Sequence, residues 1–397
     1  METIMKLPPF QELPAKLAAS LEELAPEACH LSDFLASRPE PSGGERVACA
    51  VHADFLRRHG FNTKTEICGF ETAFCAGGKW GNGDPAVTLL AEYDALPGIG
   101  HGCGHNLAGA MTSLAAATIL RCREFENAEL RVLGTPCEET GDAKAAMTDQ
   151  GVFDDTEIAL MIHPAPGFST VSFRSVAHSV REVAFRKPSA RADVNETSLL
   201  PMEALDSFRL KLLSFHDESC PAAVSPACFE NGVESFSAPG LAKCRFAFFS
   251  ARRNFLDNFL EKVHEMAAGE SKRLGLLHSW KAVDADLSEF LPNKAAERHM
   301  QKIFGKLGLS QAPSPMLHGS ADVGNVSRAC PVVHPMLDVT GEKLPWHSLE
   351  FAEATTRPKA HEALVLGAAA LTLFVTEFAL SKSFRQAVSE EHRSRRS

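Results

Sequence analysis

Apolar positions recur at helical spacing near the start of the chain and as short runs further on. Between residues 11 and 60, the segments "LAASLEELA" and "VACAVHADFLRRHG" place apolar side chains every three to four positions, and Gly60 follows as a helix C-cap. From residue 86 the pattern changes to the runs "AVTLLAEY", "AELRVLGTP" and "EIALMIHPA", with helix-like stretches between them. We expect an N-terminal helical pair and then an α/β domain whose mostly parallel central sheet is flanked by helices.

The middle of the chain has a different pattern of strand-like and helix-like segments. Strand-like "VREVAFRKP" and "CRFAFFSAR" and the helical "NFLDNFLEKVHEMAAGESKRLG" predict a smaller α+β unit. After it, "CPVVHPMLDV" and the long helix "HEALVLGAAALTLFVTEFAL" return to the α/β style. A chain of 397 residues exceeds what one hydrophobic core usually serves. We therefore expect one domain built from 1–172 and 285–397, an inserted domain at 173–284, and a frayed tail at 384–397.

The composition and charge of the chain argue against some classes of binding partner. The net charge is −10, and basic residues cluster only in the short tail "RSRRS", which argues against nucleic acid. The N-terminus carries Pro-Pro and acids rather than a signal peptide, and no later run is expected to reach membrane-spanning length. Eleven scattered cysteines are typical of a reducing compartment. We expect a cytoplasmic protein that acts on a small molecule, without a nucleic-acid or membrane partner.

Polar side chains follow three of the predicted strands at their C-terminal ends. Glu92 and Asp94 end the first run, Glu138 and Glu139 follow the second, and His163 ends the third. The carboxyl ends of parallel strands meet at one edge of a sheet, which is where α/β proteins bind ligands. These residues should converge on one crevice.

The stretch "GIGHGCGHN" that follows Asp94 places Cys103 and His105 among glycines that let the backbone fold closely around a bound group. Thiolate, imidazole and carboxylate together suit zinc or another divalent first-row ion. The candidate ligands are Cys103, His105, Glu139, His163 and His347. Spacing alone does not exclude other histidines, which are His101, His178, His216, His318 and His334. As structural alternatives, Cys103 is a buried thiol and His163 a hydrogen-bonded residue at a strand end.

Two adjacent carboxylates, Glu138 and Glu139, point in opposite directions if their segment is extended. One can then bind a metal while the other reaches a water activated by that metal. The residues by themselves therefore predict metal-dependent hydrolysis.

Five segments in order resemble one enzyme family. These are "AEYDALPGIGHGCGHN", "GTPCEETGDAKAAM", "GVFDDTEIALMIHPAP", "HGSADVGNVS" and "WHSLEFAEA". They resemble the aminoacylase and carboxypeptidase metallopeptidases, in the amidohydrolase branch that contains p-aminobenzoyl-glutamate and indoleacetyl-amino-acid hydrolases. The resemblance covers most of 85–170 and 315–375.

The resemblance implies a catalytic α/β domain with two divalent ions (zinc, manganese, cobalt or nickel) and an inserted lid of four strands and two helices through which homodimers form. It implies that the metal ligands are Cys103, His105, Glu139, His163 and His347. By the same resemblance, Glu138 is the general base for a metal-bound hydroxide that attacks an amide carbonyl, and Asp94 orients a ligand. Asp322 and Asn325 of "HGSADVGNVS" fall at substrate-binding positions.

The lid departs from the family pattern. Where the family has a histidine that holds the substrate carbonyl, this chain has Arg191, which could still bind an oxyanion or a carboxylate. Phe236 and Phe249 stand near the usual asparagine and arginine, with Arg252 or Arg253 as alternatives for the arginine. Phenylalanines there favour an aromatic or apolar substrate.

Three functions follow from these observations. The leading expectation is a metal-dependent amidohydrolase of a small N-acyl amino acid or related amide. One alternative is a hydrolytic deaminase of a small amine, aromatic amines included. The other is a metal-retaining binding protein without turnover, although such a protein would not require Glu138.

Overall fold

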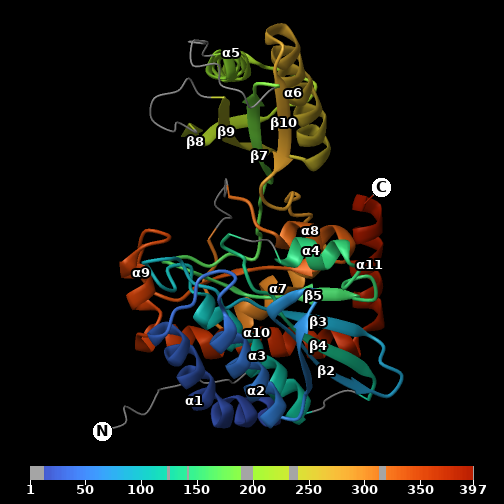
Figure 1. Cartoon of the computed structure of the whole chain (residues 1–397). Helices are drawn as coiled ribbons and strands as arrows, with labels where there is room; N and C mark the ends of the chain where they lie inside the picture. Colours follow the sequence, from blue (N-terminus) through green and yellow to red (C-terminus); the bar gives the residue numbers. More distant parts are fainter. Residues whose placement is uncertain are drawn as a thin grey trace. The chain divides into compact units, whose positions relative to one another are not determined.

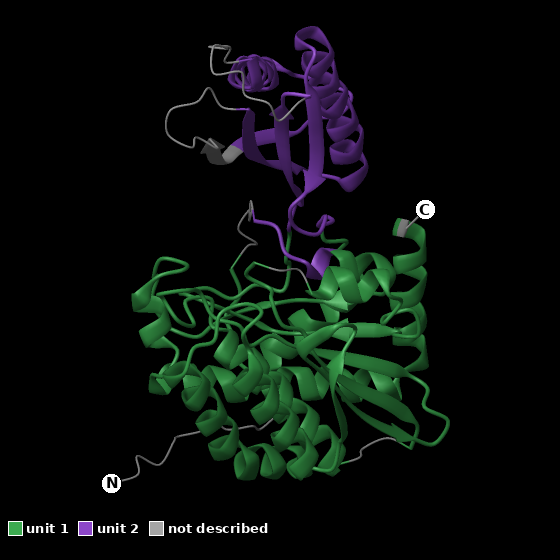
Figure 2. Ribbon diagram, viewed as in Figure 1, with its two compact units in different colours: residues 1–174, 290–317, 325–397 green, residues 175–289, 318–324 purple. Residues whose placement is uncertain are grey.

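The computed structural model describes residues 13–122, 126–140, 143–188, 200–231, 240–312 and 319–396, which fall into two compact units (Figure 2). Unit 1 comprises 1–174, 290–317 and 325–397, and unit 2 comprises 175–289 and 318–324. The predicted insertion covered 173–284, and the segment 318–324 lay outside it.

Unit 1 contains a six-stranded sheet in the order β1-β2-β4-β3-β5-β11. Strands β4, β3, β5 and β11 are parallel, while β1 and β2 form an antiparallel hairpin on β4. The predicted α/β fold with its mostly parallel sheet is therefore confirmed. The strands are β1 (Asn62–Ile67), β2 (Phe70–Trp80), β3 (Ala86–Ala91), β4 (Ala128–Gly134), β5 (Ile158–Leu160) and β11 (Val332–Val333).

The run "EIALMIHPA" forms two strands instead of one. Its first part is β5, and its second part is β6 (His163–Ala165), which pairs with β12 (Met336–Asp338) in a separate two-stranded sheet. The break between the two strands places His163 just beyond the carboxyl end of β5, as the sequence predicted for a strand-end residue.

Helices cover both faces of the main sheet (Figure 1). Helix α3 (His105–Cys122) connects β3 to β4, and α4 (Ala143–Asp149) connects β4 to β5 in the opposite direction along the sheet. Right-handed crossovers place two such helices on opposite faces. Helices α1 (Ala15–Ser37), α2 (Arg46–Arg58) and α10 (Pro358–Leu380) pack with α3 around the main core.

Helix α10 corrects one expectation. It has 23 residues and a mean hydropathy of 2.0 in its most apolar window, so it is long and apolar enough to cross a membrane. However, 83% of that window is buried inside the protein, which is typical of the core helix of a globular domain. It packs mainly against α3.

The C-terminal segment is also different from the expected frayed tail, because it forms helix α11 (Lys382–Arg396). Val388 on this helix is fully buried, and Phe384 packs against the main core. Glu391 accepts hydrogen bonds from the backbone N–H groups of Lys294 and Ala295, which begin helix α7 (Lys294–Lys306). Its charge-rich composition concealed two apolar residues four positions apart, Phe384 and Val388.

Unit 2 is a four-stranded antiparallel sheet in the order β10-β7-β9-β8, with two helices packed on it. Its own core contains Phe185, Phe208, Phe246 and Phe248. The described residues thus show the four strands and two helices that the family resemblance implied for the lid. These elements are β7 (Ala177–Arg186), α5 (Leu200–Ser214), β8 (Ala223–Asn231), β9 (Leu241–Ser250), α6 (Arg253–Leu274) and β10 (Leu277–Ala282).

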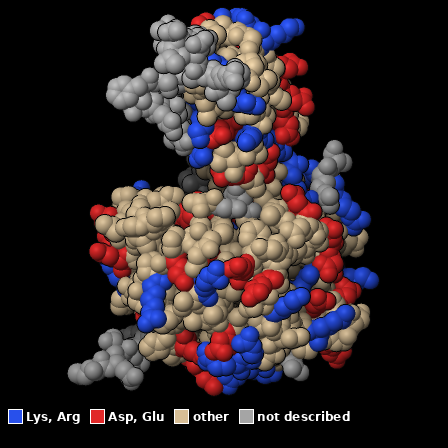
Figure 3. All heavy atoms as spheres, viewed as in Figure 1, with Lys and Arg blue, Asp and Glu red and all other residues tan. Residues whose placement is uncertain are grey.

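On the face drawn in Figure 3, basic and acidic side chains are interspersed over unit 1 rather than gathered by sign.

Candidate metal centre

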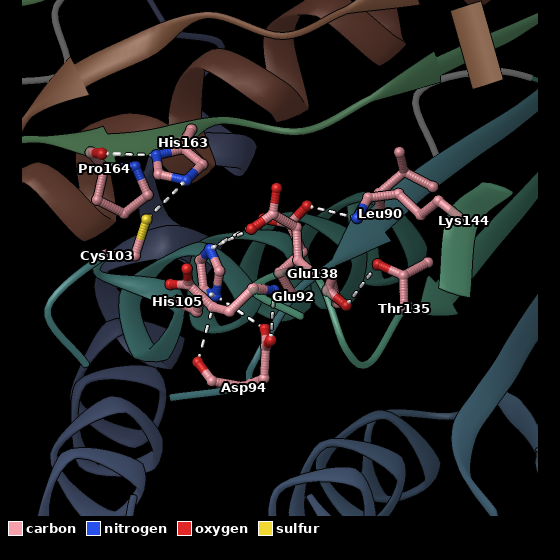
Figure 4. A network of polar contacts seen from close by, with 12 residues as sticks. Leu90, Glu92, Asp94, Cys103, His105, Thr135, Glu138, Lys144, His163 and Pro164 are labelled. Atoms are coloured by element: carbon pink, nitrogen blue, oxygen red, sulfur yellow. Dashed lines mark hydrogen bonds and ion pairs between the residues drawn. The ribbon is translucent and has the colours of Figure 1, made fainter. Parts of the chain in front are cut away.

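The candidate ligands come from separate segments at the carboxyl edge of the unit 1 sheet. Cys103 lies in the glycine-rich turn before α3, and His105 is the first residue of that helix. Glu139 follows β4, and His163 opens β6. His347 lies in the turn before helix α9 (Leu349–Ala354). Residues from distant parts of the sequence, such as Cys103, His105 and His163, thus lie close together, as the strand-end argument predicted (Figure 4).

The ligand atoms form two overlapping sets. Cys103, His105 and His163 make one set, and Cys103, Glu139 and His347 make the other; the atoms within each set lie within 4.8 Å of one another. Cys103 Sγ is 3.6 Å from His163 Nε2, and Glu139 Oε2 is 3.7 Å from His347 Nε2. Two donors bound to one ion at a tetrahedral angle lie roughly 3.5 Å apart. Each set thus matches the spacing of a coordination shell, and Cys103 belongs to both.

The donor chemistry fits divalent ions. His105 Nε2 and Glu139 Oε1 are buried, and no hydrogen-bond partner is present for either among the described residues. Buried polar atoms are nearly always satisfied, so an exception indicates a missing group. Sulfur, nitrogen and oxygen donors in one small volume are typical of zinc and its first-row neighbours.

The carboxylate of Asp94 fixes the orientation of His105. His105 Nδ1 lies 2.9 Å from Asp94 Oδ1, which directs Nε2 of the same ring toward the donor set. Burial alone would lower the pKa of His105, but Cys103 and Asp94 raise that pKa well above its ordinary value. The orienting role expected for Asp94 has this geometric basis.

Glu138 stands beside the two sets. Its Oε2 is 3.8 Å from His105 Nε2, and His105, Glu138 and Glu139 also form a group within 4.8 Å. Its side chain is 15% exposed, whereas that of Glu139 is 5% exposed. Of the two adjacent carboxylates, Glu138 is thus the one with more access to solvent.

Sequence reasoning missed an ion pair at this site. Lys144 on α4 is fully buried, and its Nζ lies 2.8 Å from Glu92 Oε1. The second oxygen, Glu92 Oε2, is 3.4 Å from His105 Nε2. Burial opposes ionisation of Glu92, but Lys144 and nearby imidazoles lower its pKa to about 2. A lysine amid small helix residues, "AKAAM", gave no signal because its partner lies 52 positions earlier in the chain.

The other histidines lie outside the ligand sets of the described residues. His178 is a strand residue of β7, as expected, and stacks on Phe249 at 4.7 Å. His334 is buried beside His163, with the two rings 5.8 Å apart, and burial lowers its pKa to about 3. His101 is also buried, His216 follows α5, and His318 lies outside the described residues.

Of the expected lid residues, Arg191 and Phe236 lie outside the described part of the chain. Phe249 is on β9, and Arg253 begins α6, where its guanidinium contacts Asp257 and Ser179. The guanidinium of Arg252 lies over the ring of Phe255. Asp322 is buried directly before helix α8 (Val323–Ala329), and Asn325 is within that helix.

The chain is similar to known hydrolases in sequence and to solved structures in fold. No family model matches the chain. It is 26% identical over 313 residues to a human Xaa-Arg dipeptidase, covering 76% of this chain and 72% of that protein. It is 25% identical over 302 residues to one of the p-aminobenzoyl-glutamate hydrolase subunits of Escherichia coli K12, covering 70% of this chain and 62% of that protein.

Solved structures show the same fold. An aminobenzoyl-glutamate utilization protein from Klebsiella pneumoniae superposes with a TM-score of 0.74 at 15% identity, covering 92% of this chain and 99% of that one. A dinuclear metal-binding peptidase from Bacillus subtilis superposes with a TM-score of 0.69 at 17% identity, covering 90% and 99%. The sequence relatives are hydrolases of C–N bonds, and the structures confirm the fold that the five motifs implied.

Proposed function

Because this chain belongs to the aminoacylase and carboxypeptidase metallopeptidases, in their amidohydrolase branch, and is a hydrolase of C–N bonds, we propose that it cleaves the amide bond of a small N-acyl amino acid or a related amide. The observation that carries the proposal is the pair of donor sets that share Cys103, with the Glu138 carboxylate beside them. A protein that only retained metal would not need this additional carboxylate.

We propose that two divalent ions occupy the sets, with Cys103 as the ligand common to both. Cys103, His105 and His163 would hold one ion, and Cys103, Glu139 and His347 would hold the other. Bound ions of this kind polarise a carbonyl and lower the pKa of water toward 7. Zinc, manganese, cobalt and nickel all suit this mixed set of donors.

Glu138 then moves the proton. As general base it takes a proton from the attacking water, and as general acid it gives that proton to the nitrogen of the leaving amine. Asp94 keeps His105 in one ring orientation, and Lys144 balances the negative charge of Glu92 close to His105. Asp322, Asn325 and the lid residues Arg191, Phe236 and Phe249 are proposed to bind substrate.

An aromatic or apolar group on the substrate is supported by unit 1 itself. Trp346 is half-buried, its ring lies 5.8 Å from that of His163, and Phe168 lies edge-on to it at 6.3 Å. A flat apolar surface next to the donor sets would pack against an aryl or alkyl group. Of the relatives named above, the p-aminobenzoyl-glutamate hydrolase subunit has an aryl group in the substrate that its name gives, which agrees with this class.

The experiment is a substrate panel with metal-loaded protein. N-acyl amino acids, dipeptides, aryl amides and aminoaromatic compounds are incubated with wild type and with Glu138→Gln, and released amine and ammonia are measured separately. We expect amine release from aryl-acyl or alkyl-acyl amino acids, reduced roughly 10³-fold or more in Glu138→Gln, with two ions per chain still bound to that variant.

Each other result changes the assignment. Ammonia without a second organic product would indicate the deaminase. No turnover of any compound by the fully loaded protein would indicate a binding protein. Loss of metal in Glu138→Gln would show that Glu138 is a ligand rather than the base.

We also propose that the protein is cytoplasmic and forms a homodimer through unit 2. Eight of its ten described cysteines are buried, which suits a reducing compartment. In unit 2, Leu210 and Leu213 of α5 and Leu277 of β10 are 63%, 55% and 40% exposed. Apolar side chains of this size on one small unit favour a partner surface. Analytical ultracentrifugation of wild type against Leu210→Glu tests this proposal.

A further inference from the structure

Glu45 is a fully buried carboxylate far from the donor sets in sequence. It stands immediately before helix α2, yet its side chain makes no capping hydrogen bond to that helix. Its two oxygens instead accept hydrogen bonds from other segments: Oε1 from the backbone N–H of Cys137 at 2.8 Å, and Oε2 from the hydroxyl of Thr72 at 3.0 Å. Two donors and the positive end of α2 stabilise the buried charge.

Cys137 has an unusual backbone conformation. Its φ is +60°, in the left-handed region that residues other than glycine rarely adopt. It directly precedes Glu138, so its φ helps to set the direction in which the Glu138 side chain leaves the chain. Strained backbone of this kind persists only where the surroundings hold it.

A second carboxylate, that of Asp94, holds the backbone on the other side of Glu138. The backbone N–H of Glu139 donates to Asp94 Oδ2 at 2.9 Å, and the Ser42 hydroxyl donates to that same oxygen at 2.8 Å. The N–H groups on both sides of Glu138 therefore end on carboxylates, one from Glu45 and one from Asp94. Ser42 and Glu45 both belong to the turn "PSGGE" before α2.

We infer that Glu45 is a positioning residue for the proposed general base: by holding the Cys137 N–H, it fixes the left-handed turn that aims the Glu138 carboxylate. The inference rests on the proposed function, and it extends the machinery to a turn 92 residues earlier in the chain than Cys137. Glu45 does not touch the substrate or the metal ligands in this account.

The test compares Glu45→Ala, Glu45→Gln and Thr72→Val. Glu45→Ala removes the acceptor for Cys137, whereas Glu45→Gln retains a carbonyl oxygen at that place. Thr72→Val removes only the other donor to Glu45 and is the matched control for general destabilisation. For each variant, kcat and KM are measured with the fastest N-acyl amino acid of the panel, bound metal by titration with Mn²⁺, and exchange of the Cys137 amide by hydrogen–deuterium exchange of metal-free protein.

We expect Glu45→Ala to lower kcat roughly 10- to 100-fold with KM changed less than about threefold, because misplacing a catalytic group costs turnover more than binding. Mn²⁺ stoichiometry should remain at two, and the Cys137 amide should exchange much faster than in wild type, while Val132 within β4 stays protected. Glu45→Gln and Thr72→Val should keep kcat within about threefold of wild type.

Three results would overturn the inference: a wild-type kcat in Glu45→Ala, unchanged exchange at Cys137, or an equal loss of kcat in Thr72→Val. If Glu45→Ala does not fold, the hydrogen exchange and kcat of Glu45→Gln decide, since a Cys137 amide protected as in wild type supports the hydrogen bond and a lost one contradicts it. If Glu138→Gln remained active, the proposed function would fail instead, so the two failures are distinguishable.

Discussion

The charged groups of the two units differ in whether they have partners. In unit 2, Asp286 accepts hydrogen bonds from Arg181 at 2.8 and 2.7 Å and from Ser179, and Arg253 is held by Ser179 and Asp257. In unit 1, by contrast, His105 Nε2 and Glu139 Oε1 are buried, and the described residues contain no hydrogen-bond partner for them. Charges that satisfy one another hold a fold together, whereas donors that converge without partners indicate a site for something else.

The same difference separates structural from functional roles of similar residues. Arg253 was an alternative for a substrate-binding arginine, yet its guanidinium is engaged by neighbours within unit 2, including the carbonyl oxygens of His178 and Leu287. Cys103 had a structural alternative as a buried thiol, yet it is the one residue common to both donor sets. The contacts of each side chain distinguish a structural from a functional role, which residue type and sequence spacing alone left open.

The largest test of this contrast replaces one buried cysteine in each unit. Cys103→Ser exchanges a soft ligand for a weak oxygen donor in both sets, so we expect the affinity for Zn²⁺ to fall roughly 100-fold or more and turnover to fall with it. Cys220→Ser in unit 2 is the matched control, since Cys220 is 1% exposed and belongs to neither set. Metal content after dialysis against a chelator measures the effect. Equal metal retention by the two variants would reduce Cys103 to a neighbouring thiol.

A second test removes the central carboxylate of unit 2. Asp286→Ala leaves Arg181 and Arg253 without this partner, and because the Asp286 side chain is 40% exposed, the expected loss of stability is roughly 2 kcal/mol rather than the full cost of a broken buried pair. Urea denaturation measures the loss. Metal content and Zn²⁺ affinity should be unchanged, because the donor sets belong to unit 1; a loss of metal would contradict the separation of roles.

The sequence predicted the part of the site that depends on strand ends. The positions of Glu139 and His163 followed from apolar runs that end in polar residues, since parallel strands bring their carboxyl ends together, and those of Cys103 and His105 followed from the glycine-rich stretch after Asp94. His347 was a candidate from its residue type alone, and the family resemblance assigned it to a ligand position that no periodicity indicated. The parallel core of the fold followed from the same alternation of runs.

Residues that act over long sequence distances gave no local signal. Glu45 stands in a turn that reads as a loop, and its partner Cys137 is 92 positions away. Strand β2 lacks clean alternation because it is buried along only part of its length. Helix α11 read as a tail because most of its side chains are charged or polar. Two buried side chains, Val388 and His392, hold it in place. Tertiary contacts decided all three.

A third test compares the units in acid. His52 in unit 1 is fully buried, and burial, followed by the nearness of His101, lowers its pKa to about 3. The unfolded chain takes up this proton below about pH 6.5 while the folded chain does not, so the free energy of unfolding falls with pH in that window, by roughly 2 kcal/mol at pH 5. In unit 2, burial also lowers the pKa of His178, but Asp284 and Asp286 oppose the shift.

We therefore expect unit 1 to lose stability first as pH falls from 6.5. His52→Gln keeps a partner for the Ser113 hydroxyl, which lies 2.9 Å from His52 Nδ1, but does not titrate. This variant should be less stable than wild type at pH 8, and the difference should narrow toward pH 5. Urea denaturation at four pH values measures both curves; parallel curves would show that His52 does not drive the acid response.

The smallest test concerns a half-exposed carboxyl group in unit 1 that lies 4.0 Å from Arg385 Nε. Glu157, just before β5, has its pKa raised to about 7 by burial and by the carboxyl of Asp84. A raised pKa in the folded state stabilises the fold fully below about pH 4.5, and this contribution is lost as pH rises through 7. Gln resembles the protonated form, so Glu157→Gln should be more stable than wild type at pH 8 and equal to it at pH 4.5. Because the side chain is 40% exposed, water screens the effect, and we expect a gain of under about 1 °C in Tm.

Calorimetry at the two pH values checks this gain in Tm, and Asp84→Asn should reproduce the gain without adding to it in the double variant. A gain at both pH values would mean that Gln packs better there, and that the Glu157 and Asp84 carboxyls do not share a proton.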